Sequence, residues 1–345
     1  MTTKTRYFVV GSLLTVGVGL GIGAVAYSTG FATSAYTLQG GPAELQFVPA
    51  NASLVAYADV HDLMLSDLRQ RVHRLAFPGK LDGQSDFQNQ TGINIETDID
   101  HVIAALVPST GDQVGHTSGT GIVLARGRFD QVKIEALMRE HGAQAEDYKG
   151  SRLIVGDIPA GRTDGRTDGR TSVSVAFLEP GLVAVGSSAL VRSAVDQKTG
   201  GASIATNDEM MGLIRDLGTG NAWAAGRFDA LTSHAHLPDG VAEQIPSIHL
   251  FSASAHIDSG VRGLIRAQTR DDESANSLRD VVRGFLALAR LQTSANPEIS
   301  NLVQSLQLGG TGKSVSLSFD VPGAALDALQ SLDKRGDRSS SAPRQ

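Results

Sequence analysis

The chain has 345 residues, no cysteine, and 36 acidic against 30 basic side chains, for a formal net charge of −6 at pH 7. The lack of cysteine excludes disulfides, thiolate metal sites and catalytic thiols. The acidic balance argues against nucleic acid or anionic lipid as the main partner, because both repel a negative surface. A chain of this length can bury a sizeable core, in one large domain or two smaller ones.

The first predicted element is an uncharged apolar stretch, Phe8–Phe31, near the N-terminus. About 19 residues of α-helix cover the hydrocarbon core of a bilayer, so residues 8–26 are long enough to span it. Lys4 and Arg6 precede the stretch, and the positive-inside rule therefore keeps the N-terminus cytoplasmic and exports the remainder. We predict a cytoplasmic stub and transmembrane signal anchor at residues 1–31, in a single-pass cell-membrane protein with an extracytoplasmic, periplasmic body.

An alternative is that the apolar stretch is removed as a signal peptide, because Ala24-Val-Ala26 offers a small-x-small cleavage site. Cleavage would leave a secreted soluble protein, but the length of the stretch favours an uncleaved anchor. Glycines four apart on a membrane helix let two backbones approach closely, which would permit a homodimer, although glycine is common in membrane helices in general. The glycines that would form this helix-packing face are Gly17, Gly19, Gly21 and Gly23.

Beyond the anchor, residues 32–49 are predicted to be a linker, because Gly40-Gly41-Pro42 interrupts any helix. A strand is expected at residues 53–60 and a helix with an apolar stripe at residues 62–75. Two further strands are expected at 101–107 and 121–129, followed by a helix at 131–141 that Asp130 is placed to cap. Strands at 148–155, 172–178 and 182–185 then lead into a helix at 188–197.

The second half of the chain begins with a predicted helix at 207–217 and a strand at 221–229. Alternating strands at 248–257 and 261–269 flank Asp258-Ser-Gly260, a good hairpin signal. Helices are expected at 274–292, 298–306 and 323–332, with a strand at 315–321 between the last two. Residues 333–345 are polar and Ser-rich, so we predict a disordered tail.

A tetrapeptide recurs: Gly127-Arg-Phe-Asp130 is repeated as Gly226-Arg-Phe-Asp229, each time at the end of a predicted strand. In both copies Phe is expected to pack, Asp to cap the following helix, and Gly to permit a turn. The recurrence predicts an α+β module used twice, at residues 50–203 and 204–332. The predicted fold is therefore α+β: a transmembrane helix followed by two related modules of mostly antiparallel sheet with packed helices, which could share one sheet.

Several segments imitate chemical motifs. Gly309-Gly-Thr-Gly-Lys-Ser314 is similar to the end of a phosphate-binding loop, but Gln307 replaces the first glycine and a strand follows instead of a helix. A Gly-rich turn is therefore expected. The His234-Ala-His236 pair and the acids at 96, 98 and 100 lack partners at metal-ligand spacing, and there is no G-x-S-x-G elbow. The sequence thus identifies no catalytic, cofactor-binding or metal-binding residue, and no cofactor.

The chain resembles a family of bacterial membrane-anchored exported proteins that is labelled only as a domain of unknown function. The segments that carry the resemblance are residues 47–59, 226–229 and 280–290. The resemblance implies one N-terminal membrane segment and an exported α+β body over most of the remaining chain. It supplies no catalytic residues.

These observations predict a membrane-anchored extracytoplasmic protein that acts as a noncatalytic binding or structural component of the cell envelope. Its expected partners are the bilayer, through residues 8–26, and a protein or another envelope component, with no nucleic acid. An extracytoplasmic hydrolase with dispersed catalytic residues is the alternative. A pocket in which two or more titratable groups converge would favour the hydrolase, and an apolar surface patch would favour binding.

Overall fold

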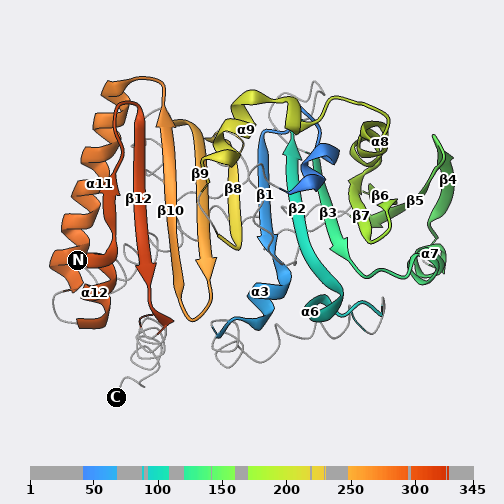
Figure 1. Cartoon of the computed structure of the whole chain (residues 1–345), viewed down its shortest axis with the longest axis horizontal. Helices are drawn as coiled ribbons and strands as arrows, with labels where there is room; N and C mark the ends of the chain where they lie inside the picture. The colour runs from blue at the N-terminus through green and yellow to red at the C-terminus, as the bar shows by residue number, and fades with distance from the viewer. Residues whose placement is uncertain are drawn as a thin grey trace, which may run out of the picture.

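The computed structural model describes residues 42–67, 88, 92–108, 120–140, 142–159, 170–217, 220–228, 230, 248–293, 297–323 and 325. Their twelve strands form one sheet in the order β11-β12-β10-β9-β8-β1-β2-β3-β7-β6-β5-β4, and Figure 1 shows it running from α11 and α12 at one end to β4 at the other. Every pairing between neighbouring strands is antiparallel. An α+β fold with a large antiparallel sheet is therefore confirmed.

The strands of the first half of the chain have the following bounds: β1 Leu54–Asp59, β2 Ile99–Val107, β3 Thr120–Gly127, β4 Gln144–Tyr148, β5 Ser151–Pro159, β6 Arg170–Glu179 and β7 Leu182–Ser187. Those of the second half are β8 Ala222–Arg227, β9 Ile248–Ile257, β10 Val261–Thr269, β11 Gln307–Gly309 and β12 Ser314–Val321. The two halves meet where β1 pairs with β8, from Leu54 opposite Gly226 to Ala58 opposite Ala222. Both halves thus share one sheet, while the domain boundaries themselves stay a prediction.

Helices cover both faces of the sheet. The α-helices are α3 Val60–Leu65, α6 Ile95–Asp98, α7 Gln131–Glu140, α8 Ser188–Gln197, α9 Asp208–Arg215, α11 Asp272–Thr293 and α12 Pro297–Ser305, and the short 3-10 helices are η2 Ala43–Phe47 and η3 Ile204–Thr206. None of the described helices is long and apolar enough to cross a bilayer. The predicted span at residues 8–26 lies outside the described part of the chain.

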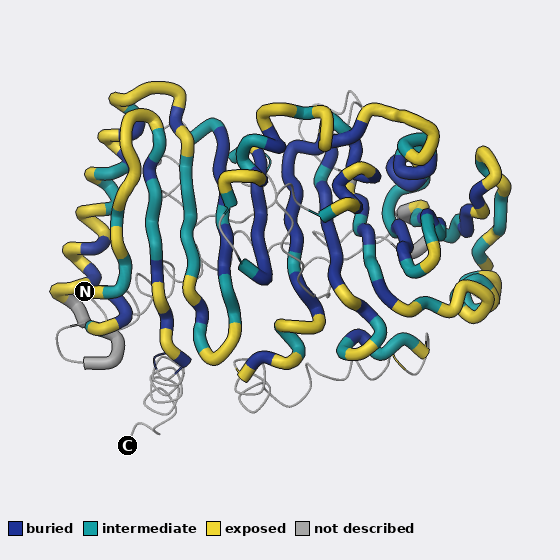
Figure 2. Tube along the Cα trace, viewed as in Figure 1, coloured by how far each residue is buried: buried dark blue, intermediate teal, exposed yellow. Residues whose placement is uncertain are grey.

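We call the sheet face beneath η2, α8 and α9 the η2 face. Its core joins Phe47 of η2 and Val191 of α8 to strand side chains such as Ile103 and Trp223. The opposite face, which we call the α11 face, buries other clusters, including Leu302 of α12 against strand residues of β10 and β12. Figure 2 shows burial concentrated in β8, β1 and β2, in the middle of the sheet. The middle strands bury apolar side chains on both faces.

Most predicted elements are present, with differences at their ends. Residues 43–47, placed in the linker by the sequence, instead form η2 and enter the core, where Phe47 is buried. The helix after β1 starts at Val60, since the carboxylate of Asp59 accepts a hydrogen bond from the amide of Asp62 at 2.8 Å and caps it. The strand expected at 148–155 is in fact a hairpin of β4 and β5, with a turn at Lys149 (φ 49°) and Gly150 (φ 77°).

Candidate functional site

The η2 face changes character between the two halves of the sheet. Over β1, β2 and β8 it is buried core, but over β9, β10 and β12 its side chains are mainly polar. Because directly opposed residues of antiparallel strands project to the same face, the register defines this surface. It consists of Ser252, Ser254 and His256 on β9, Arg262, Leu264, Arg266 and Gln268 on β10, and Ser314, Ser316, Ser318 and Asp320 on β12.

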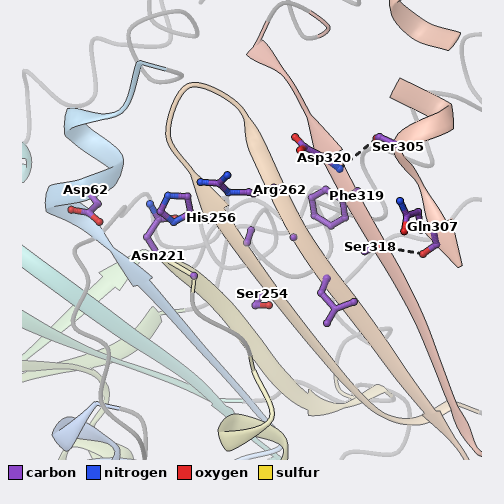
Figure 3. Close-up of a pocket in the computed structure, with 14 residues that line it drawn as sticks. Asp62, Asn221, Ser254, His256, Arg262, Ser305, Gln307, Ser318, Phe319 and Asp320 are labelled. Atoms are coloured by element: carbon purple, nitrogen blue, oxygen red, sulfur yellow. Dashed lines mark hydrogen bonds between the residues drawn. The ribbon is translucent and has the colours of Figure 1, made fainter. Parts of the chain in front are cut away.

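A pocket of about 750 Å³ opens over the end of this polar surface that is nearest to the β9–β10 hairpin. Figure 3 shows side chains from several elements around it: Asp62 from α3, His256 from β9, Arg262 from β10 and Asp320 from β12. Ser254, Ser318 and Gln307 also line the pocket, and they add hydroxyl and amide groups. The pocket therefore offers both hydrogen-bond donors and acceptors within one volume.

The hairpin between β9 and β10 holds the two basic side chains of the pocket. One oxygen of the Asp258 carboxylate accepts hydrogen bonds from the amides of Ser259 and Gly260 in the turn. The other oxygen lies 3.5 Å from the guanidinium Nη2 of Arg262 and 3.8 Å from Nε2 of His256. The amide of Gly260, with the Ser259 groups and Arg262, holds the pKa of Asp258 below its ordinary value. Asp258 thus stays ionised and keeps Arg262 and His256 adjacent.

Carboxylates stand on either side of these two basic groups. Figure 3 shows Asp62 beyond His256, and Asp320 is the direct cross-strand partner of Arg262. Both residues are exposed. Among the described residues, no ion pair or hydrogen bond engages either side-chain carboxylate. Across the pocket, the acceptor Asp62 is thus followed by the basic groups of His256 and Arg262 and then by the acceptor Asp320.

The pocket belongs to a longer row of polar residues that crosses the sheet at one level, from β12 to β3. Successive members are cross-strand partners in the sheet. The exception is Asn221, which directly precedes β8 and whose carbonyl accepts a hydrogen bond from the Asp59 amide. In order, the row is Asp320, Arg262, His256, Asn221, Asp59, His101 and Arg126. Neither of the two described pockets reaches its last three members.

The buried end of the row is a charge cluster under η2. Glu44 of η2 is 6% exposed, and its carboxylate accepts a 2.8 Å hydrogen bond from Nε of Arg126. His101 Nε2 lies 3.2 Å from the same carboxylate oxygen, and a second acid, Glu179, binds Arg126 at 3.1 Å. Burial alone would raise the pKa of Glu44, but His101, the backbone and Arg126 together lower it from 4.5 to about 2. Glu44 and His101 are buried within the cluster and neither described pocket reaches it, so we interpret it as structural.

The first copy of the repeated tetrapeptide lines a smaller pocket of about 510 Å³. Its Arg128 donates to the Thr97 carbonyl and lies 3.4 Å from the Asp98 carboxylate, and its Asp130 caps α7 by accepting from the Lys133 amide at 3.0 Å. The glycine has a different role from the predicted turn, because a Cβ there would collide with the backbone of Asp98 and Ile99, where α6 meets β2. In this copy Asp130 has the expected capping role, and Phe129 packs against the cluster that contains Val60 and Ile95. Asp229 of the second copy lies outside the described residues.

The residues singled out in the sequence do not meet in this site. Gly17, Gly19, Gly21 and Gly23 lie outside the described residues, as do both histidines at 234 and 236. The Gly-rich segment before Ser314 is a turn between β11 and β12, with positive φ at Gly310 and Gly312, as expected. Within the described ranges, no three His, Asp or Glu side chains gather so as to hold a metal ion.

Sequence reasoning missed the pocket residues, although one signal was present. Polar residues recur at every second position in Ser252, Ser254 and His256, and again from Ser314 to Asp320. This alternation predicts a polar face for each strand separately. It cannot show that β12 joins β10, because two helices separate these strands in the chain.

No family model matches the chain, and the curated proteins contain no significant match. Among solved structures, the chain is similar to that of TP0453 in crystal form I, with a TM-score of 0.45 and 9% sequence identity. The alignment covers 86% of this chain and 99% of that one.

Proposed function

We propose that the protein is a membrane-anchored extracytoplasmic binding protein of the cell envelope, whose ligand occupies the pocket over β9, β10 and β12. The observation that carries this proposal is the convergence of polar side chains from four elements in a volume of about 750 Å³. Ligand pockets commonly enclose roughly 300–1,000 Å³. Elsewhere the same sheet face is buried under η2, α8 and α9, whereas Arg262 and Asp320 of the pocket are exposed.

The exposure of the pocket's side chains favours binding over catalysis. The side chain of Arg262 is 61% exposed and that of His256 is 38% exposed. Enzyme sites gain much of their effect by excluding water, which strengthens every electrostatic interaction inside. An open, hydrated pocket instead suits reversible recognition. The outer side of α11 adds exposed apolar side chains, Phe285, Leu288 and Leu291, and such surfaces are typical of contacts with other molecules.

A hydrolase remains the second candidate because one observation favours it. Asp62, His256 and Asp320 are titratable and line the same pocket, and converging titratable groups are a recognised sign of an active site. If these groups act on the ligand, a cleaved product should form and Asp320→Asn should abolish it. If they only bind, the ligand should be recovered unchanged.

The membrane anchor is part of the proposal and rests on the sequence. In this view residues 8–26 span the bilayer, the two related modules stand outside the cytoplasm, and the glycine face of the span permits a homodimer. Secretion after cleavage at Ala26 is the alternative. The intact mass of the natively expressed protein and its distribution between membrane and soluble fractions separate the two: a full-length mass in membranes supports the anchor, and a soluble mass that begins near Tyr27 overturns it.

The binding role can be tested by photocrosslinking in native membranes. A photoreactive amino acid replaces Ser318 inside the pocket or, as a matched control, Val132, which is 79% exposed on α7 at the other end of the sheet. We expect an adduct at position 318 that is absent at 132 and is lost when Gln307→Trp, directly opposite Ser318, fills the pocket. Equal labelling at both positions, or a position-318 adduct that survives Gln307→Trp, would overturn the proposal.

A further inference from the structure

We infer that the ligand of this pocket is a carboxylated glycan, with its carboxylate on Arg262 and His256 and its hydroxyl groups on Asp62 and Asp320. This inference rests on the proposed function and adds the chemical class of the ligand. It is argued from the order and the kind of polar groups in the pocket.

The centre of the pocket is suited to a carboxylate. The guanidinium of Arg262 presents paired N–H donors that match the two oxygens of a carboxylate, and His256 beside it can donate a further hydrogen bond. Asp258 lies 3.5 Å from Nη2 of Arg262 and 3.8 Å from Nε2 of His256 on the hairpin side, so the ligand's carboxylate uses the N–H groups of Arg262 that point away from Asp258. Asp258 positions both side chains before the ligand arrives, which reduces the entropy that binding would otherwise lose.

The two ends of the pocket are suited to hydroxyl groups. Ionised Asp62 and Asp320 can only accept hydrogen bonds, so they require donors on the ligand. Their negative charge on both sides of Arg262 disfavours a ligand with several anionic groups, such as a polyphosphate, and favours one carboxylate among neutral donors. A sugar acid meets both requirements, since one ring carries a single carboxylate together with several hydroxyls.

The remaining lining groups also match a hydroxylated ligand. Ser254 and Ser318 are cross-strand neighbours of Leu264 on the same face, and Gln307 stands opposite Ser318. Hydroxyl and amide groups both donate and accept, as sugar hydroxyls do. An apolar ligand would remove these groups from water without replacing their hydrogen bonds, at a cost in free energy.

The decisive measurement compares two matched ligands on the full-length protein in detergent. One is an oligosaccharide containing glucuronic acid, and the other is the same oligosaccharide with each carboxyl group reduced to an alcohol. Isothermal titration should show the acidic form binding at least tenfold more tightly. Free glucuronate, titrated in parallel, separates recognition of a single sugar acid from recognition of a polymer.

Three variants assign the effect to residues. Arg262→Met keeps an unbranched apolar stem without the charge, and it should remove the preference for the acidic sugar. Asp320→Asn should weaken both oligosaccharides by a similar factor. Arg283→Met is the matched control, because Arg283 on α11 is also exposed and paired with an aspartate, Asp280, at 2.8 Å. It should change neither affinity.

The outcomes separate this inference from the proposed function. Equal binding of the acidic and reduced sugars, or a preference that survives Arg262→Met, overturns the carboxylate assignment while the pocket keeps its binding role. Failure of both sugars to compete with the adduct at Ser318 overturns the glycan class. Absence of that adduct in the first place overturns the proposed function itself.

Discussion

Replacing Glu44 by Gln should destabilise the protein far more than replacing Glu179 by Gln, although both carboxylates bind the same guanidinium. Glu44 belongs to η2, which packs over the core of the η2 face. Its side chain is 7% exposed, and its carboxylate lies 2.8 Å from Nε of Arg126. The side chain of Glu179 is 40% exposed and lies 3.1 Å from the same residue. The two substitutions are isosteric and share the partner Arg126. Glu44 differs in being buried and in lying 3.2 Å from Nε2 of His101.

The pKa of Glu44 sets the expected size of the effect. A fall from 4.5 to about 2, at about 1.4 kcal/mol per pKa unit, corresponds to about 3 kcal/mol of stability at neutral pH. Removing one member of a buried ion pair costs a similar amount, roughly 3–5 kcal/mol. We therefore expect Glu44→Gln to lose about 3 kcal/mol. Glu179→Gln should lose about 1 kcal/mol or less, because solvent screens an exposed pair.

The pH dependence gives an independent check on the cause. Because the pKa of Glu44 is lower in the folded than in the unfolded state, its stabilisation is complete above about pH 4.5 and is lost as the pH falls toward 2. The amide that replaces this carboxylate does not titrate. The difference in unfolding free energy between the wild type and Glu44→Gln should therefore shrink to about half its neutral value by about pH 3.

Urea unfolding followed by tryptophan fluorescence is the appropriate assay. Trp223 is the only tryptophan of the chain, is 8% exposed and stacks on Tyr57 at 5.5 Å. Tyr57 in turn lies 5.6 Å from His101 of the charge cluster. Equal losses for the two glutamate variants, or a Glu44→Gln deficit that stays constant down to about pH 3, would refute the assignment of this cluster as a buried, ionised network.

Five further substitutions test packing and helix capping, each by urea unfolding. Gly226→Ala should lower the free energy of unfolding by about 1–3 kcal/mol, because its Cβ would collide with the backbone of β1. Gly212→Ala in α9, where a Cβ meets open space, should raise it by about 0.5–1 kcal/mol. Equal effects of the two substitutions would contradict this explanation. Asn207→Ala should cost about 1 kcal/mol, since Asn207 caps α9 at 3.1 Å, but Ser187→Ala should be nearly neutral, because no cap bond forms there. Leu302→Ala, at a site 3% exposed, should cost about 2–5 kcal/mol, and a loss below about 1 kcal/mol would show that α12 packs loosely.

Local patterns predicted the elements that depend on local chemistry. The alternation on either side of Asp258-Ser-Gly260 predicted β9 and β10 with the bounds that the structure has, because a short turn fixes both the pairing and the register. The capping side chain of Asp130 likewise predicted the start of α7. In contrast, β4 was missed because Gln144–Tyr148 is a polar strand at the edge of the sheet. An edge strand need not bury an apolar face, so it leaves little alternation to read.

Pairings between distant segments were beyond the sequence. The contact of β1 with β8 joins the two halves of the chain, yet Leu54 and Gly226 carry no mutual signal in the sequence. The repeated tetrapeptide gave no indication of this pairing, because its copies end β3 and β8, which are not neighbours in the sheet. Gly226 has no side chain and therefore allows β1 to approach closely, but it would allow another strand to approach in the same way.

The polar row shows why a candidate site cannot be recognised from the sequence even when the polar character of its residues can. His101 and His256 stand at the same level of one sheet and project from the same face, beside Asp59 and Arg262 respectively. His101 is 8% exposed because η2 covers it, and its Nε2 lies 3.2 Å from the Glu44 carboxylate in the charge cluster. His256 lies beyond that cover, and its side chain is 38% exposed. The difference is made by residues 43–47, which the sequence assigns to a linker. The proposed binding site therefore depends on where the covering elements end, which the strands alone do not encode.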